Sequence, residues 1–251
     1  MNDKLPTIQF QQLGQDAYKR IIASPSQSQA YFDRFHKPVI ETARSRFGRT
    51  TNVLSIACGY GHELVFFKKY KRIRAFGIDI NSNMLDEARG NNPNAVFVTW
   101  DVRDRKSRFM HGKFQMSIAI NALIYCPYDM AAFMHKALAP GAFGVVNLRI
   151  GNEPLNAPFF KDCIKMGCKD DKEEVKAGKY TFTLRAMDYT ARTDSLQRLG
   201  RQLYFRTERD AQDFFAICGF EIYSQKVYQY PSEENLKNTV QVFTLQKPDK
   251  Y

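Results

Sequence analysis

The sequence has no apolar run that approaches the roughly 20 residues needed to cross a bilayer. Residues 1–10 also lack the charged start and apolar core of a secretory signal. These two absences predict a protein without a membrane span that resides in the cytoplasm.

The chain has few cysteines, and their spacing matches no common paired motif. The chain has five cysteines, an odd number, and no pair stands in CxxC spacing. This pattern argues against a zinc site and against a disulfide framework. We expect reduced thiols and no metal site.

Acidic residues are too few to balance the basic ones. The chain has 37 Lys and Arg against 26 Asp and Glu, which gives a formal net charge of +11. A basic surface attracts nucleic acid, anionic lipid or acidic proteins. The basic residues are spread along the chain, however, without a basic tail or a low-complexity arm. Charge therefore leaves RNA open as a less favoured partner.

Short apolar runs alternate with helical patterns through the middle of the chain. The predicted strands are 53–57, 75–80, 95–100, 114–121 and 143–149, and the predicted helices between them are 62–70, 82–89 and 130–139. Repeated β-then-α units indicate a parallel sheet covered by helices on both faces.

This rhythm fails after residue 150 and returns near residue 207 with a helix over 208–218. Two strands follow, over 220–228 and 239–246, and the polar loop between them predicts antiparallel neighbours.

We expect an N-terminal helical cap over 1–50, with helices at 14–23 and 28–47. The core would comprise 51–150 and 207–251. The insertion over 151–206, with a strand at 180–184, would cover the carboxyl edge of the sheet and could mediate a dimer.

The segment VLSIACGYGHE, residues 53–63, places a glycine turn after the first strand. Gly59 and Gly61 permit positive φ and a close approach of ligand to backbone. Nucleotide sites and packed structural turns share this feature. Asp79 ends the next strand about 20 positions beyond, where a carboxylate can bind both ribose hydroxyls of a nucleoside. Its competing role is to cap the next helix, with Ser82 as a rival cap.

These segments together resemble class I S-adenosylmethionine-dependent methyltransferases. The resemblance rests on VLSIACGYG, GIDINSNMLDEAR, TWDVRD, FQMSIAINALIYCP, ALAPGAFGVVNLR and AICGFEI, in this order. It covers residues 50–150 and 207–247. It implies an enzyme that uses S-adenosylmethionine and an α/β, Rossmann-like, doubly wound sheet of about seven strands. The last strand would be antiparallel, with a helical cap before the sheet and a lid insertion after strand five.

The resemblance also assigns cofactor contacts. The methionine half would be wrapped by Ala57, Cys58, Gly59 and Gly61, and approached by Asn121. The nucleoside would be held by Asp79 at the ribose, Ile80 and Met84 on the adenine face, and Asp101 with the Val102 amide at the adenine edge.

Two positions at the first strand and its turn depart from the family pattern. The family often has an acid at the position of Ser55 and a glycine at that of Ala57. Without the acid, we expect the methionine ammonium to rest on carbonyls of the turn and of Asn121.

The acceptor is less determined than the cofactor. Tyr125, just after strand four, and His62, after the turn, are the candidate catalytic residues, although local packing is the stronger interpretation of His62. The candidate acceptor-binding residues are Tyr31, Tyr125, Arg149, Tyr204 and Arg206. Aromatic walls with a few polar groups favour a small molecule, apolar, aromatic or carboxylate-bearing, methylated on oxygen or nitrogen. The alternatives are an RNA or protein methyltransferase and a non-catalytic module that binds S-adenosylmethionine.

Overall fold

The computed structural model describes residues 29–48, 50–104, 110–151, 170–177, 179–192, 196–229 and 239–249. The helix predicted over 14–23 lies outside these ranges. No helix among the described residues is long and apolar enough to cross a membrane.

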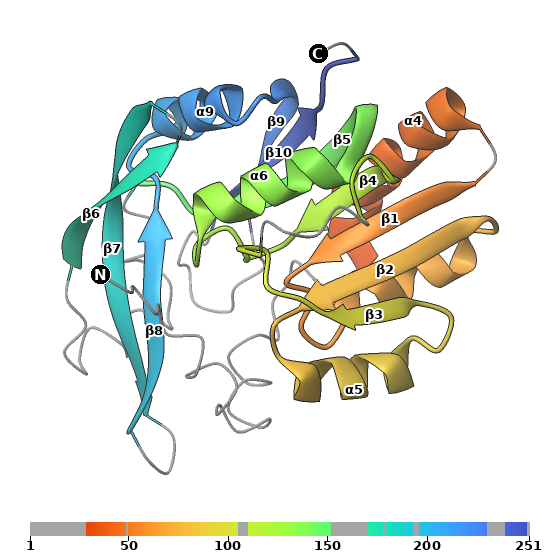
Figure 1. The fold of residues 1–251 in the computed structure, drawn as a ribbon, viewed down its shortest axis with the longest axis horizontal. Coiled ribbons are helices and arrows are strands. Elements are labelled where there is room, and N and C mark those ends of the chain that lie inside the picture. Colours follow the sequence, from red (N-terminus) through yellow and green to blue (C-terminus); the bar gives the residue numbers. More distant parts are fainter. Residues whose placement is uncertain are drawn as a thin grey trace.

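A seven-stranded sheet forms the centre of the molecule, in the order β3-β2-β1-β4-β5-β10-β9 (Figure 1). Its strands are β1 (Thr51–Ile56), β2 (Ile73–Asp79), β3 (Val96–Thr99), β4 (Phe114–Ala119), β5 (Leu138–Leu148), β9 (Glu221–Gln229) and β10 (Thr239–Gln246). The pairs from β3 to β5 are parallel, whereas β10 is antiparallel to both β5 and β9. The predicted sheet, including its antiparallel last strand, is confirmed. Chain order reverses between β1 and β4, the place where such sheets bind ligands.

Helices cover both faces of this sheet because alternate apolar side chains of its strands point to opposite sides. The helical elements are α3 (Gln29–Tyr31), η2 (Phe32–His36), α4 (Lys37–Phe47), η3 (His62–Lys69), α5 (Ser82–Asn91), α6 (Pro127–Ala137) and α9 (Glu208–Ile217). Leu54 and Ile56 of β1 share a cluster with buried residues of α6 and α9. Val53 shares the other cluster with α4, η3 and α5.

Two of these helices differ from a regular α-helix. The helix expected over 28–47 contains a π-helical turn, η2, whose wider winding leaves Phe32, Phe35 and His36 all buried. The segment after the glycine turn, η3, is a 3-10 helix. Because 3-10 winding places residues three apart on one face, Leu64 and Phe67 both point into the core.

A second, three-stranded antiparallel sheet comprises β6 (Asp170–Ala177), β7 (Tyr180–Arg192) and β8 (Leu196–Tyr204). Figure 1 shows it beyond the end of the main sheet toward which β1 and β2 point. The Leu203 amide donates to the Ile124 carbonyl at 2.6 Å, and Phe205, directly after β8, forms a parallel bridge with Ile150. Ala177 and Leu184 of the second sheet also share the core cluster of α6 and α9. The strand predicted at 180–184 is part of β7. The role of this sheet as a lid, and the domain boundaries, stay predictions.

Candidate active site

The turn between β1 and η3 is wound through three left-handed residues. Ala57, Gly59 and Gly61 have φ of 52°, 51° and 66°. The Cys58 amide donates to the Ile78 carbonyl at 3.0 Å, and the Gly61 amide donates to the Cys58 carbonyl at 2.8 Å. The conformation explains why glycine is common in the family at position 57, since an alanine there bears a Cβ in a region that disfavours it.

Asp79 ties the end of β2 to this turn. Its Oδ2 accepts the Gly59 amide at 2.8 Å, and its Oδ1 accepts the Asn81 amide at 2.9 Å. Burial raises the pKa of the Asp79 carboxyl, and the backbone amides that it accepts oppose that rise. A carboxylate offers about four lone-pair sites, so Asp79 can still receive a ribose hydroxyl beside its backbone bonds from Gly59, Asn81 and Ile80.

Asp79 does not cap the helix that follows. The N-cap of α5 is Asn81, whose side chain accepts the amides of Asn83 and Met84. The two caps weighed from the sequence, Asp79 and Ser82, are therefore both wrong. Asn81 takes the role because it has the extended backbone of an N-cap, immediately before the first helical residue.

The residues expected around the adenine lie beyond the carboxyl ends of β2 and β3. Met84 is buried at the start of α5, and Ile80 is half-buried after Asp79. The Trp100 amide donates to the Asp79 carbonyl at 2.9 Å, which brings the segment with Asp101 and Val102 beside β2.

Asp101 already has a partner that the sequence did not reveal. Arg103 Nε donates to Asp101 Oδ1 at 2.8 Å, and the Arg103 amide donates to the same oxygen at 3.0 Å. Burial acts to raise the pKa of Asp101, but the bonds from Arg103 outweigh it and the pKa lies below its ordinary value. Asp101 is thus held as a carboxylate, the form that accepts from an amino group.

Asn121 follows β4 with φ of 54°. Its amide donates to Asn147 Oδ1 at 2.5 Å, and Asn147 Nδ2 donates to Asn121 Oδ1 at 3.2 Å. Asn147 lies on β5 and is buried. This pairing fixes the loop after β4, and it was missed because it joins residues far apart in sequence.

The two candidate catalytic residues lie in different surroundings. His62 is exposed at the start of η3, with its ring 5.9 Å from that of Tyr60. Tyr125 is half-buried in the loop after β4 and packs against the core cluster of α6 and α9. The carbonyl of the adjacent Ile124 accepts the hydrogen bond from the Leu203 amide of the second sheet. Catalytic roles for both stay predictions.

Three of the predicted acceptor residues gather at the carboxyl end of β5. Arg149 follows this strand, and the bridge between Ile150 and Phe205 brings the flanking Tyr204 and Arg206 to it. Tyr204 is buried and Arg206 is exposed.

Tyr31, another predicted acceptor residue, is 0% exposed in the cluster of α4 and η3. Its ring centroid lies 4.7 Å from that of Phe35 and 5.1 Å from that of Tyr228. It is a core residue here, and its part in acceptor binding stays a prediction.

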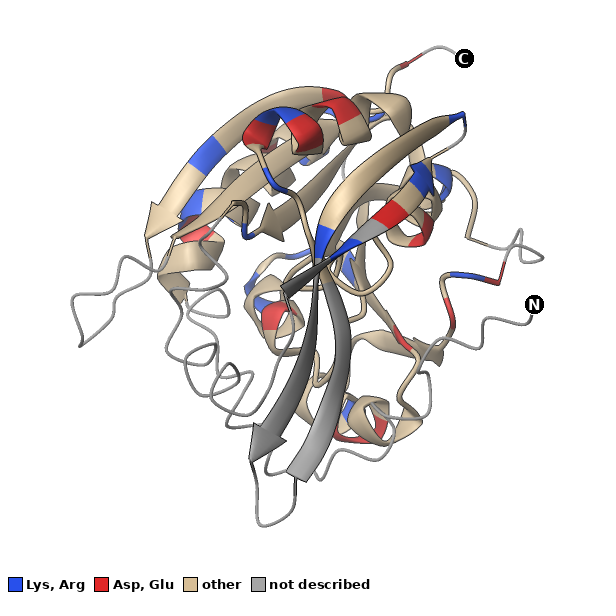
Figure 2. Ribbon diagram, turned by 90° about the vertical axis from the view of Figure 1, so that its left-hand side faces the viewer, with Lys and Arg blue, Asp and Glu red and all other residues tan. Residues whose placement is uncertain are grey.

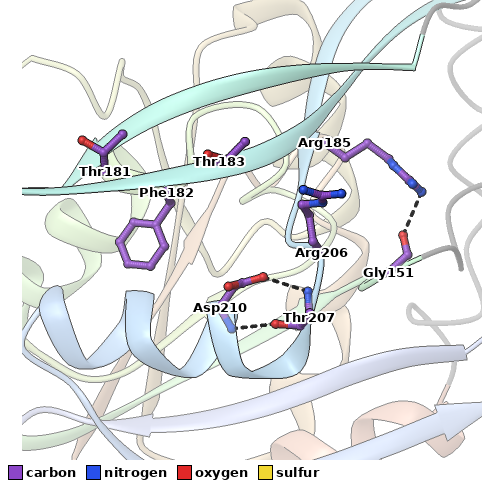
Figure 3. A pocket seen from close by; sticks show the side chains of 8 residues that line it. All are labelled: Gly151, Thr181, Phe182, Thr183, Arg185, Arg206, Thr207 and Asp210. Atoms are coloured by element: carbon purple, nitrogen blue, oxygen red, sulfur yellow. Dashed lines mark hydrogen bonds between the residues drawn. The ribbon is translucent and has the colours of Figure 1, made fainter.

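A hollow of about 600 Å³ opens between β7, α9 and the end of β5 (Figure 3). It is lined by Gly151, Thr181, Phe182, Thr183, Arg185, Arg206, Thr207 and Asp210. Arg185 Nη1 donates to the Gly151 carbonyl at 3.1 Å. Thr207 and Asp210 bond each other's backbone amides and so cap α9. Arg185 was not singled out from the sequence, because only its pairing opposite Tyr204 brings it to this place.

A buried pair beneath the glycine turn was also missed. Ser55 Oγ donates to Glu63 Oε1 at 2.6 Å. Glu63 follows the turn in η3 and is 5% exposed. A carboxylate at the start of a helix ordinarily indicates a solvated residue, so the sequence alone gave no signal of its burial.

The comparisons with known proteins agree with this geometry. A sequence model described as a methyltransferase domain matches residues 53–141. No match was found among curated protein sequences.

Solved methyltransferase structures share the fold. One from Methanosarcina mazei is 18% identical, with a TM-score of 0.59, covering 85% of this chain and 98% of its own. One from Clostridium acetobutylicum is 10% identical, with a TM-score of 0.60 and coverages of 93% and 98%. Magnesium protoporphyrin IX methyltransferase from Synechocystis, with bound S-adenosylhomocysteine, is 15% identical, with a TM-score of 0.58 and coverages of 96% and 97%.

The residues present fit S-adenosylmethionine. The left-handed turn offers backbone to the methionine half, and Asp79 retains hydrogen-bonding capacity for the ribose. Asp101 is held in its charged form for the adenine edge. Together with the methyltransferase domain matched over residues 53–141, these features identify the chain as a methyltransferase that uses S-adenosylmethionine as its cofactor.

Proposed function

We propose that the enzyme methylates a small molecule that bears a carboxylate and binds where the second sheet meets the end of β5. The observation that carries this proposal is the hollow lined by Arg185 and Arg206. Guanidinium groups bind planar carboxylates through paired hydrogen bonds. Arg149 follows the neighbouring strand end and adds a third basic residue to this region.

The carboxyl edge of a parallel sheet is where an acceptor would meet the methyl group. Bound S-adenosylmethionine supplies a methyl carbon attached to a positively charged sulfur. A lone pair of the acceptor forms the new bond to this carbon as the carbon–sulfur bond breaks, and the sulfur keeps the electron pair. The protein contributes mainly orientation and charge placement.

A carboxylate acceptor can attack through its own lone pair, so it needs no general base. In this proposal Tyr125 forms a wall beside the reacting atoms and Arg206 orients the acid. The exposed His62 is not required. A structural neighbour named for methyl transfer to magnesium protoporphyrin IX supports a small-molecule acceptor, although it shares only 15% identity.

The test is an assay with radiolabelled S-adenosylmethionine against anionic and neutral fractions of a metabolite extract, followed by mass spectrometry of the product. We expect label in the anionic fraction. For the acceptor so found, Arg206→Gln should raise KM by about 10- to 100-fold with little change in kcat, the scale of a lost charged hydrogen bond. Arg209→Gln, on the exposed face of α9, is the matched control. Label confined to neutral compounds would contradict the proposal.

The net charge of +11 keeps RNA as a second candidate acceptor. On the side shown in Figure 2, however, Lys and Arg alternate with Asp and Glu over the described elements. In α9, for example, Arg209 stands among Glu208, Asp210 and Asp213. Retention on heparin that persists at physiological salt, with label transferred to RNA, would favour this alternative.

A further inference from the structure

The methyltransferase family often carries an acid at the carboxyl end of the first strand, and this chain has Ser55 there. Ser55 is 0% exposed and is paired with Gly77 of β2 and Ile118 of β4, at the centre of the sheet. Its hydroxyl donates to Glu63 at 2.6 Å. The carboxylate of Glu63 therefore reaches back beneath the turn to the place where a longer acidic side chain at position 55 would end.

Core packing does not account for this carboxylate. Leu64 and Phe67 supply the apolar contacts of η3 with the core, whereas Glu63 brings a charge into it. Burial raises the pKa of Glu63 to about 7, the bonds from Ser55 and from its own backbone oppose the rise, and negative Asp79 adds to it. None of the described groups that shift this pKa is a cation. A buried carboxylate without a counter-charge is costly, so the site suits an incoming cation.

We propose that Glu63 supplies the carboxylate that the family carries at the position of Ser55, and that it neutralises the ammonium group of the cofactor's methionine. This revises the expectation that carbonyls of the turn and of Asn121 hold the ammonium alone. The inference rests on placing the cofactor at the turn, and it is independent of the acceptor.

The test compares two nucleosides that differ at the amino-acid end. S-adenosylhomocysteine has the ammonium group, whereas 5′-methylthioadenosine lacks the amino acid. Calorimetry should show that Glu63→Gln weakens binding of S-adenosylhomocysteine at least about tenfold and changes binding of methylthioadenosine by less than about twofold. The exposed Glu41→Gln on α4 should change neither affinity.

Equal weakening of both nucleosides would overturn the proposal, because it would show that Glu63 only shapes the turn. Unchanged binding of both would overturn it as well. Wild-type protein that binds neither nucleoside would overturn the cofactor placement itself, and the role of Glu63 with it.

Moving the charge provides a rescue. Ser55→Asp alone places two acids within hydrogen-bonding distance and should weaken S-adenosylhomocysteine binding. Ser55→Asp combined with Glu63→Gln returns the acid to the strand and should recover most of the affinity lost in Glu63→Gln. A folded double variant, checked by thermal denaturation, that binds no better than Glu63→Gln would overturn the proposal.

The pH dependence of S-adenosylhomocysteine binding provides a further test of the proposal. Glu63 must be ionised to bind a cation, and its pKa is near 7. The affinity of the wild-type protein for S-adenosylhomocysteine should therefore rise with pH between about 5.5 and 7.5, where an α-ammonium is mostly charged. Glu63→Gln should remove most of this rise, and an unchanged slope in that variant would overturn the proposal.

Discussion

The carboxylate of Asp79 accepts the backbone amide of Gly59 at 2.8 Å, which joins the end of β2 to the glycine turn after β1. The residue proposed to hold the ribose thus also fixes the backbone proposed to hold the methionine. One side chain therefore joins the two proposed halves of the cofactor site.

Replacing Asp79 by Ala should weaken cofactor binding by about 1–3 kcal/mol, the scale of lost charge-assisted hydrogen bonds. Calorimetry with S-adenosylhomocysteine measures this change. Unlike Glu63→Gln, this variant should also lose affinity for 5′-methylthioadenosine, which retains the ribose. Asp86→Ala, an exposed carboxylate on α5, is the control. Full affinity in Asp79→Ala would contradict the ribose assignment.

The sequence predicted the main sheet because its strands are short buried runs separated by amphipathic helices. It did not predict β6, Asp170–Ala177, whose residues are mostly charged and show no alternation of apolar side chains. This strand exists through its pairing with β7, a contact that local propensity cannot reveal.

The candidate site divides in the same way. Asp79 and Asp101 could be found because each ends or follows a strand at a recognisable position. The sequence does not reveal the roles of Glu63, Arg103 and Asn147. Each role depends on a hydrogen bond to a partner that only the folded chain brings into reach. Alanine at position 57 departs from the family pattern, but the sequence does not show that its backbone is left-handed.

Ala57→Gly should stabilise the protein. Alanine at φ of 52° carries a steric cost of about 1–2 kcal/mol, which glycine avoids. The greater freedom of glycine in the unfolded chain offsets about 0.5–1 kcal/mol of that gain. We expect a net rise of up to about 1.5 kcal/mol in the free energy of unfolding, measured by urea denaturation. Ala75→Gly, in β2, is the same change without the steric relief and should be destabilising. Equal losses in both variants would contradict the strain at Ala57.

Gly77→Ala should destabilise both the fold and the cofactor site. A Cβ at Gly77 would lie 2.7 Å from Cys58 Sγ and 2.7 Å from Phe97 Cδ1, so both side chains must move. Overpacking of this kind costs about 1–3 kcal/mol. Since Cys58 belongs to the turn, cofactor affinity should fall as well. Thermal denaturation and calorimetry measure the two effects.

The matched control is Gly90→Ala in α5, where a Cβ meets no atom within 4 Å. Alanine is the better helix former, so this variant should gain up to about 1 kcal/mol and keep its cofactor affinity. If Gly77→Ala were as stable as Gly90→Ala, the close packing of the turn against β2 would be contradicted.

His36 should make the protein sensitive to acid. It is 1% exposed, and its ring lies among Tyr31, Phe32 and Phe67. Burial lowers its pKa to about 3 from the ordinary histidine value of 6.5. Because the folded pKa lies below the unfolded one, the unfolded chain binds more protons between these values. The stabilisation is complete above the unfolded pKa and is lost as pH falls toward the folded pKa.

At pH 5 this single group should lower the free energy of unfolding by about 2 kcal/mol relative to neutral pH. Urea denaturation of the wild-type protein and of His36→Phe across this range measures the effect. The phenyl ring cannot take up a proton, so His36→Phe should lose less stability on acidification. His111→Gln, in an exposed turn, should behave as the wild type. Parallel pH profiles for the wild type and His36→Phe would show that His36 is not the group that resists protonation in the fold.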